Sequence, residues 1–136
     1  MANGRPWGRL TQRPEFLKVA ASRRRWVTPG LILQVAESSA AGPQSLFRLG
    51  FTASRKVGGA VQRNRARRRL RAAAAGVMPL HAARGMDYVL VARAETVTRP
   101  YASLLGDLEA ALKRLKLWRE ERSVAGARAS AAREER

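Results

Sequence analysis

A long stretch without acidic residues in the middle of the chain constrains the fold more than any other feature. No Asp or Glu occurs between Glu37 and Asp87, while the same window holds ten Lys or Arg, eight of them between Arg55 and Arg71. Residues 60–75 lack Gly and Pro and consist largely of Ala, Arg and Leu, which are good helix formers. This pattern predicts a basic helix with a narrow apolar stripe, which requires a core on one side and an anion on the other.

The overall composition predicts one folded domain that binds a polyanion. The chain has 136 residues, of which 46% are hydrophobic, and a formal net charge of +17. A chain of this length can bury a core, and so large a positive charge repels itself unless a polyanion neutralises it. We expect a folded domain over residues 13–118, between a flexible N-terminal segment (1–12) and a flexible Ala/Arg/Glu tail (119–136).

The sequence excludes several kinds of chemistry. It contains no Cys and one His, so disulfides, thiolate metal sites, Cys nucleophiles, His-based metal sites and a Ser-His-Asp triad are ruled out. We therefore expect no catalytic or metal-ligating residue and no cofactor bound by the protein alone. No apolar run is long enough to span a membrane, and the N-terminus lacks a secretory signal. A cytoplasmic protein is expected, with an Arg-rich organelle transit peptide as the alternative.

Hydrophobic periodicity predicts an α+β fold in the order helix, strands, basic helix, strand, helix. The first helix opens at Pro14, and Gly76 and Pro79 are expected to close the basic helix. A turn is expected over residues 38–44. The predicted helices cover residues 14–21, 60–75 and 100–118, and the predicted strands cover 31–36, 47–54 and 87–93.

The basic helix and the turn before it carry the residues expected to bind nucleic acid. Gly58 and Gly59 let the backbone approach a phosphate closely, and the helix N-terminus that follows offers free N–H groups. Arginine side chains add forked hydrogen bonds to phosphate and flat faces for stacking on bases. Asn64 both donates and accepts, so it can bridge a phosphate, a ribose hydroxyl or a base edge.

The stretch from Ser54 to Arg71 resembles the signature of the bacterial ribonuclease P protein family. It reads SRKVGGAVQRNRARRRLR: a strand ending in Ser-basic-Lys, a glycine turn, Ala-Val, Arg-Asn, further basic residues and a hydrophobic-Arg pair. The EFLKV helix that begins at Glu15 and the Leu-rich final helix agree with the family as well. The resemblance covers roughly Leu10 to Trp118.

The resemblance implies both a fold and a function. The family fold is a two-layer sandwich of about three helices on a small, mostly antiparallel four-stranded sheet, with a left-handed βαβ crossover. The function is that of the protein subunit of ribonuclease P, which removes the 5′ leader from precursor tRNA. Catalysis belongs to the RNA subunit with Mg²⁺, so the isolated protein is expected to be inactive. One protein per RNA is expected, with ribonuclease P RNA and precursor tRNA as partners and no membrane.

Carried over residue by residue, the resemblance implies two binding surfaces. The RNA-binding residues would be Arg55, Lys56, Arg63, Asn64, Arg65, Arg67, Arg68 and Arg71. The cleft for the single-stranded 5′ leader would consist of Phe16, Gln34, Thr52, Ser54 and Lys56. The alternation of the strands independently places Gln34 opposite the apolar phase, and Thr52, Ser54 and Lys56 on a polar phase. A polar floor with one aromatic and one Lys suits an extended single strand.

The chain departs from the family in its aromatic residues. Many members carry an aromatic where this chain has Ala20, another near Gln34, and Asn in place of Gly59. Fewer aromatics weaken the stacking expected in the leader cleft. Trp26 either compensates for them or caps the sheet.

Other functions fit the sequence less well. A ribosomal or RNA-assembly protein without enzymatic partners matches the composition but does not account for the ordered signature. A DNA-binding helix-turn-helix would need a short helix before the basic one, where strands are predicted instead. A membrane-surface helix would need large apolar residues opposite its charges. A protein-only nuclease would need paired carboxylates, and Asp87 is far in sequence from Glu37 and Glu95.

Overall fold

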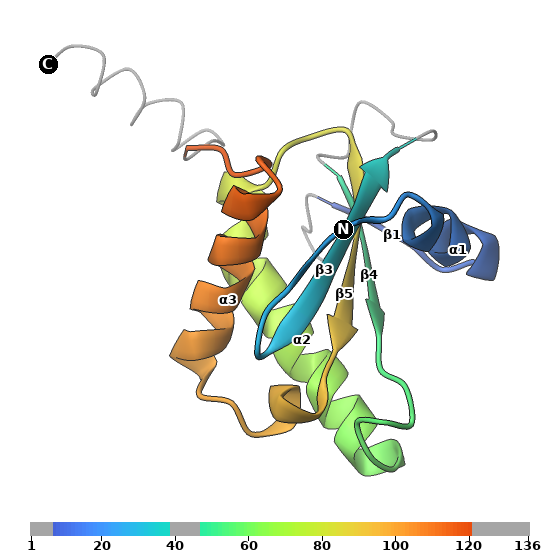
Figure 1. The fold of residues 1–136 in the computed structure, drawn as a ribbon, viewed down its shortest axis with the longest axis vertical. Coiled ribbons are helices and arrows are strands. Elements are labelled where there is room, and N and C mark those ends of the chain that lie inside the picture. The colour runs from blue at the N-terminus through green and yellow to red at the C-terminus, as the bar shows by residue number, and fades with distance from the viewer. Residues whose placement is uncertain (1–6, 39–46, 121–136) are drawn as a thin grey trace, which may run out of the picture.

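A computed structural model describes residues 7–38 and 47–120, which form a five-stranded sheet with helices on both faces (Figure 1). The expected turn over 38–44 and the tail after residue 120 therefore lie largely outside the described residues. The strand order across the sheet is β1-β4-β5-β3-β2. The strands are β1 (Gly8–Arg9), β2 (Arg24–Val27), β3 (Leu31–Glu37), β4 (Arg48–Thr52) and β5 (Met86–Ala92).

The sheet is mixed, which corrects the expected four-stranded, mostly antiparallel arrangement. Strand β4 pairs in parallel with both β1 and β5, whereas β3 pairs antiparallel with both β5 and β2. The parallel β4–β5 pair arises because a whole helix crosses over between the two strands. The hand of this crossover stays a prediction. Strands β1 and β2 were not predicted from the sequence. Strand β1 has only two residues, and all four residues of β2 are exposed, so neither shows the apolar alternation of a half-buried strand.

Three α-helices and one 3-10 helix complete the fold. The long basic helix α2 and the C-terminal helix α3 pack on one face of the sheet, and α1 lies on the other (Figure 1). The two-layer description is therefore incomplete, because α1 adds a partial third layer over a small second core of Leu10, Val19, Ala36 and Val89. The helices are α1 (Arg13–Ala21), α2 (Ala60–His81), η1 (Ala94–Val97) and α3 (Tyr101–Arg114).

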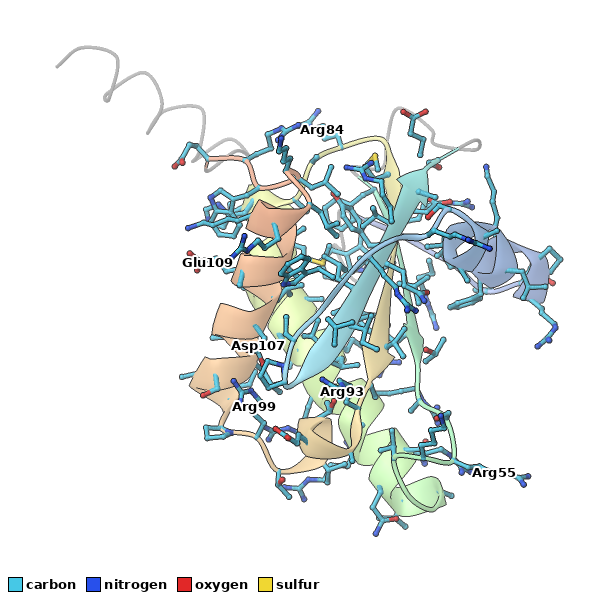
Figure 2. The ribbon with its side chains drawn as sticks, in the orientation of Figure 1. Arg55, Arg84, Arg93, Arg99, Asp107 and Glu109 are labelled. Atoms are coloured by element: carbon cyan, nitrogen blue, oxygen red, sulfur yellow. The ribbon has the colours of Figure 1, made fainter. Side chains whose placement is uncertain are left out.

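The main core lies between the sheet and the two helices α2 and α3. Alternate residues of β3 and β5 supply it, and β5 is buried on nearly its whole length, as its continuous apolar run predicts. The loop before α3 is held by Arg99, whose guanidinium donates two hydrogen bonds to the buried carboxylate of Asp107 (2.6 and 3.1 Å; Figure 2). The largest buried core side chains are Leu31, Leu33, Phe47, Leu49, Leu70, Met78, Tyr88, Leu90, Leu104, Leu108 and Leu112.

Helix α2 runs past both residues that were expected to end it. It continues through Gly76 and Pro79 to His81. The N–H that Pro79 lacks would have bonded the carbonyl of Ala75, which lies on the exposed side of the helix. Met78 is fully buried, so core packing on the last turn outweighs the local breaker. No helix among the described residues is both long and apolar enough to cross a bilayer.

The folded part of the chain begins earlier than residue 13, where the sequence places its start. Trp7 stacks on Phe47 with ring centroids 6.2 Å apart, and Leu10 is buried. The amide of Leu10 donates to the carbonyl of Leu49 (2.9 Å), which extends the β1–β4 pairing. This short N-terminal strand then leads directly into α1.

Candidate nucleic-acid interface

The arginines of α2 point to two different flanks of the helix. Those on one flank bind backbone carbonyls of the segment that leads into α3. Arg69 donates from Nε to the carbonyl of Thr96 (2.9 Å) and from Nη2 to the carbonyl of Arg99, and Arg65 donates to the carbonyl of Val97 (3.3 Å). Arg65 and Arg69 thus attach α2 to η1. The predicted RNA-binding residue Arg65 consequently has a structural contact as well.

The opposite flank and the outer surface of α2 carry the cations that face solvent. Arg67 donates to Oδ1 of Asn64 (2.7 Å), and the guanidinium of Arg71 lies 5.3 Å from the ring centroid of Phe51. Arg68 is exposed between the two flanks. We call Asn64, Arg67, Arg68 and Arg71 the α2 basic face. All four are predicted RNA-binding residues, and helical periodicity places them side by side.

The turn between β4 and α2 adds two cations beside this face. The turn is closed by hydrogen bonds from the amide of Val57 to the carbonyl of Ser54 (3.0 Å) and from the amide of Gly58 to the carbonyl of Arg55 (3.1 Å). Gly58 has φ +141°, a conformation that L side chains rarely adopt. Arg63 donates to the carbonyl of Gly58 (3.2 Å), so this predicted RNA-binding residue also stabilises the turn.

Arg55 and Lys56 are exposed at this turn, and Arg55 projects from the molecule near the N-terminal end of α2 (Figure 2). The N-terminus of α2 has no acidic residue in its first turn. The turn and the helix therefore present positive charge together, an arrangement suited to phosphate.

The predicted cleft residues Phe16, Gln34 and Thr52 share the face of the sheet on which α1 lies. In the strand register Gln34 is level with Gly50, and Thr52 is one row further along. The ring of Phe16 lies directly over Gly50, because a Cβ placed there would be 2.5 Å from a ring carbon. Beyond α1 the sheet residues on this side are only half-buried. We call Ile32, Gln34, Thr52 and Val91 the open sheet face.

Ser54 and Lys56 follow the end of β4, so the strand alternation used to assign them to a polar phase does not apply to them. Strand β4 ends at Thr52, two residues before the predicted end. The amide of Lys56 donates to Oγ of Ser54 (3.3 Å) within the turn. Both residues therefore lie in the turn that leads from β4 into α2.

An ion cluster fixes α1 on the sheet. Arg48 donates two hydrogen bonds to the buried carboxylate of Asp87 (2.7 and 2.8 Å) and one to Oε2 of Glu15 (2.9 Å). The other oxygen of Glu15 accepts the backbone N–H groups of Thr11 and Gln12 at the start of α1. These backbone hydrogen bonds, and then the charge of Arg48, lower the pKa of Glu15. The hydrogen bonds that Arg48 donates to Asp87 are the main reason that the pKa of Arg48 is raised.

The structure decides between the two interpretations of Trp26. Trp26 is in register with Leu33, a residue of the main core, and the guanidinium of Arg114 in α3 lies 5.1 Å from its ring centroid. It thus covers the helix side of β2 and does not supply an aromatic to the open sheet face. By contrast, Arg25 is in register with Gln34 and reaches the α1 side. The sequence offered no signal for Arg25, because β2 was not predicted.

Carboxylates are not gathered into a metal site in the described part of the chain. Over residues 7–38 and 47–120, no three His, Asp or Glu side chains lie close enough together to hold a metal ion. Glu15 of α1 and Asp87 of β5 both form an ion pair with Arg48.

Comparison with known proteins assigns the chain to a family. A family model described as Ribonuclease P matches residues 7–116. The ribonuclease P protein component of Paramagnetospirillum magneticum is 58% identical over 108 residues, which are 79% of this chain and 81% of that protein. The same component from Caulobacter vibrioides is 47% identical over 104 residues, covering 76% and 68% of the two chains.

Solved structures agree with the fold. The RNase P protein of Staphylococcus aureus superposes with a TM-score of 0.67 at 22% identity, covering 81% of this chain and 96% of that one. The RNase P protein of Thermotoga maritima gives a TM-score of 0.62 at 22% identity, covering 79% and 94%. Together with the signature from Ser54 to Arg71 on the turn and the α2 basic face, these matches show that the chain belongs to the ribonuclease P protein family.

Proposed function

We propose that this chain is the protein subunit of ribonuclease P and acts with a catalytic RNA to remove the 5′ leader of precursor tRNA in the cytoplasm. One observation carries the proposal. Arg71 of the α2 basic face lines the same pocket as Phe16, Gly50 and Phe51, so this basic face meets α1 at the β4 edge of the sheet. A folded RNA and a single strand that emerges from it can therefore both contact the protein.

The α2 basic face is the surface proposed to bind the catalytic RNA. Arginine forks match phosphate oxygens, and the side-chain NH2 of Asn64, whose Oδ1 accepts from Arg67, can donate to a phosphate, a ribose hydroxyl or a base edge. The face and the turn together hold five cations: Arg55, Lys56, Arg67, Arg68 and Arg71. If these cations neutralise that many phosphates, a plot of the logarithm of the association constant against the logarithm of the salt concentration has a slope of about −4.

The open sheet face is the surface proposed to bind the 5′ leader. Gln34 and Thr52 provide hydrogen-bonding groups on its floor, and Phe16 provides an aromatic ring at its edge. Ser54 and Lys56 lie where the leader passes toward the catalytic RNA. Such a surface binds a single strand with little sequence preference, because stacking and phosphate contacts tolerate any base.

Catalysis is proposed to lie in the RNA, with Mg²⁺ supplied to the phosphates by that RNA. In support, the carboxylates nearest the open sheet face, those of Glu15 and Asp87, are neutralised by Arg48. The contribution of the protein is then to raise the affinity for precursor tRNA and to lower the Mg²⁺ concentration that the RNA needs. One protein per RNA is sufficient for this role.

The test is reconstitution at a Mg²⁺ concentration where a bacterial ribonuclease P RNA alone is nearly inactive. Adding the protein should restore cleavage at the 5′ end of the mature tRNA, and the protein without RNA should not cleave. The affinity for the RNA should fall steeply with salt. Tight, salt-dependent RNA binding without restored cleavage would contradict the proposal and favour a ribosomal or assembly role. Mass measurement of the complex would establish the ratio of protein to RNA.

A further inference from the structure

The two faces of strand β2 carry one arginine each, and these arginines differ in their contacts with the rest of the protein. Arg24 points to the helix side, where its Nη2 donates to the carbonyl of Leu115 (2.9 Å), next to Trp26. Alternation then places Arg25 on the α1 side, level with Gln34 of the open sheet face. Arg25 is exposed on an outer strand of the sheet, and no intramolecular partner for it is seen in the described residues.

A hollow opens between α1 and this outer strand. It has a volume of about 450 Å³ and is lined by Ala20, Arg23 and Arg25. Ala20 lies one helical turn after Phe16, on the same side of α1. The hollow thus continues the line from Phe16 along the helix to the far edge of the sheet. The two acidic residues nearest in sequence are placed elsewhere, because Glu15 is paired with Arg48 and Glu37 lines a separate hollow with Lys18.

The backbone at Arg23 points to a role for its side chain. Arg23 has φ +60°, in the left-handed region that favours glycine. Beside Arg23, the Oγ of Ser22 lies 2.7 Å from the carbonyl oxygen of Val19 and 2.6 Å from that of Val35, and it accepts the amide of Arg24 (3.2 Å). A left-handed arginine in a tight turn is a strained choice where glycine would fit, and such strain is common at functional sites.

We propose that Arg23 and Arg25 form a phosphate-binding site for the upstream part of the 5′ leader, at the β2 edge of the open sheet face. This proposal rests on the proposed function and deepens it. From Arg25 to Gly50, under Phe16, the sheet is three strand spacings wide, or about 14 Å. A single strand lying across the face would meet Phe16 near one edge and the two guanidinium groups at the other.

The site explains how a cleft with few aromatics holds its ligand. Ala20 provides no ring for stacking, and Trp26 faces the other way. Two guanidinium groups beside Ala20 supply charge where stacking is missing, and arginine also stacks on bases through its flat face. Leader binding in this protein should therefore depend on phosphate charge as well as on base stacking.

The test compares Arg25→Ala and Arg23→Gly with Arg24→Ala, the neighbour whose side chain lies on the opposite face. Two affinities are measured: that of the isolated protein for a single-stranded leader oligonucleotide, and that of the holoenzyme for precursor tRNA with a short or a long leader. Arg25→Ala and Arg23→Gly should each lower the affinity for the oligonucleotide by about three- to tenfold. They should lower by the same factor the long-leader gain, which is the ratio of holoenzyme affinity for precursor tRNA with a long leader to that with a short leader. Each should also reduce the salt slope by about 0.7.

Two readouts separate this site from a general effect of charge or folding. Arg23→Gly should leave the Tm unchanged or raise it by up to about 4 °C, because glycine relieves the backbone strain while binding is lost. An oligonucleotide with uncharged methylphosphonate linkages should bind the wild type no better than it binds Arg25→Ala. Arg24→Ala should keep both the oligonucleotide affinity and the long-leader gain.

The proposal is overturned if Arg25→Ala and Arg23→Gly bind the oligonucleotide as the wild type does, or if Arg24→Ala loses as much affinity. Full binding of the uncharged oligonucleotide by the wild type would also overturn it, since the contacts would then be to bases. A protein that fails to activate the catalytic RNA would contradict the proposed function. The oligonucleotide measurement would still decide whether Arg23 and Arg25 bind a single strand.

Discussion

Replacing Gly50 with alanine tests how α1 and Phe16 are seated on the sheet. A Cβ at this position would lie 2.5 and 2.7 Å from two ring carbons of Phe16 and 3.1 Å from Cβ of Leu10, whereas ordinary contacts begin at 3.4 Å. The ring must therefore move by about 1 Å, and it can do so only by leaving its contacts over the sheet. The backbone of Leu10 cannot move easily, because its amide is bonded to Leu49.

The expected magnitude follows from two opposing effects. Overpacking of this kind costs about 1–3 kcal/mol, and replacing glycine by alanine in a strand returns about 0.5–1 kcal/mol. For mid-range values of both effects, Gly50→Ala should lower the free energy of unfolding by about 1 kcal/mol, and at most by about 2.5 kcal/mol, in urea denaturation followed by tryptophan fluorescence. Gly106→Ala is the matched control. It lies in α3 with nothing within 4 Å of the added Cβ, and it should stabilise the protein by about 0.5–1 kcal/mol.

The double variant Phe16→Ala/Gly50→Ala identifies the cause. If the ring of Phe16 is the obstacle, the alanine at position 50 costs little once the ring is gone. The two substitutions should then show a coupling energy of at least about 1 kcal/mol. Strictly additive effects, or a Gly50→Ala variant as stable as the wild type, would refute the placement of Phe16 over Gly50. Leader-dependent affinity should fall in the single Gly50→Ala variant, because the displaced ring no longer borders the open sheet face.

Two further predictions concern the arginines of α2 and the start of α1. Arg69→Ala should lower the free energy of unfolding by about 1–2 kcal/mol, because it removes the hydrogen bonds to the carbonyls of Thr96 and Arg99, while affinity for ribonuclease P RNA changes little. Arg68→Ala should instead lower the affinity for ribonuclease P RNA and leave the free energy of unfolding nearly unchanged. Equal effects of the two substitutions in both assays would contradict the division of α2 arginines into those that bind the protein and those that face solvent. The lowered pKa of Glu15 means that its charge stabilises the fold above the unfolded pKa of about 4.3, and that this contribution disappears as the pH falls through the lower folded value. Glu15→Gln should accordingly be less stable than the wild type at neutral pH but not in strong acid, and a constant difference in urea denaturation across this range would contradict the assigned hydrogen bonds.

Much of the fold was predictable because its signals are local. The basic helix, the apolar stripe of Ala66, Leu70, Ala73 and Ala74, and the buried strand β5 follow from the periodicity of side chains within one segment. The placement of Gln34 and Thr52 on one face also follows, since alternation along a strand needs no knowledge of its neighbours. The family signature over residues 54–71 falls on the β4–α2 turn and the first half of α2, and its role in binding RNA stays a prediction.

The errors arose where an element depends on its partners. Helix α2 continues beyond Pro79 because Met78 packs in the core. The helix propensity of single residues does not include that packing energy. Strand β2 exists because it pairs with β3, although its own residues show no apolar alternation. Ser54 and Lys56 lie outside the strand because the last residue of β4 that pairs with β5 is Thr52, and the turn follows it.

The amino-acid sequence by itself determined the basic helix, its family signature and the class of ligand, because charge and periodicity act within a single segment. The tertiary structure alone decided which arginines contact the protein and which face solvent, since Arg65 and Arg69 differ from Arg67 and Arg71 only in the element that packs beside them. It also decided that Trp26 belongs to the helix side and that Arg25 reaches the open sheet face. Those outcomes depend on strand pairing, and a strand's partner is chosen by residues far away in the chain.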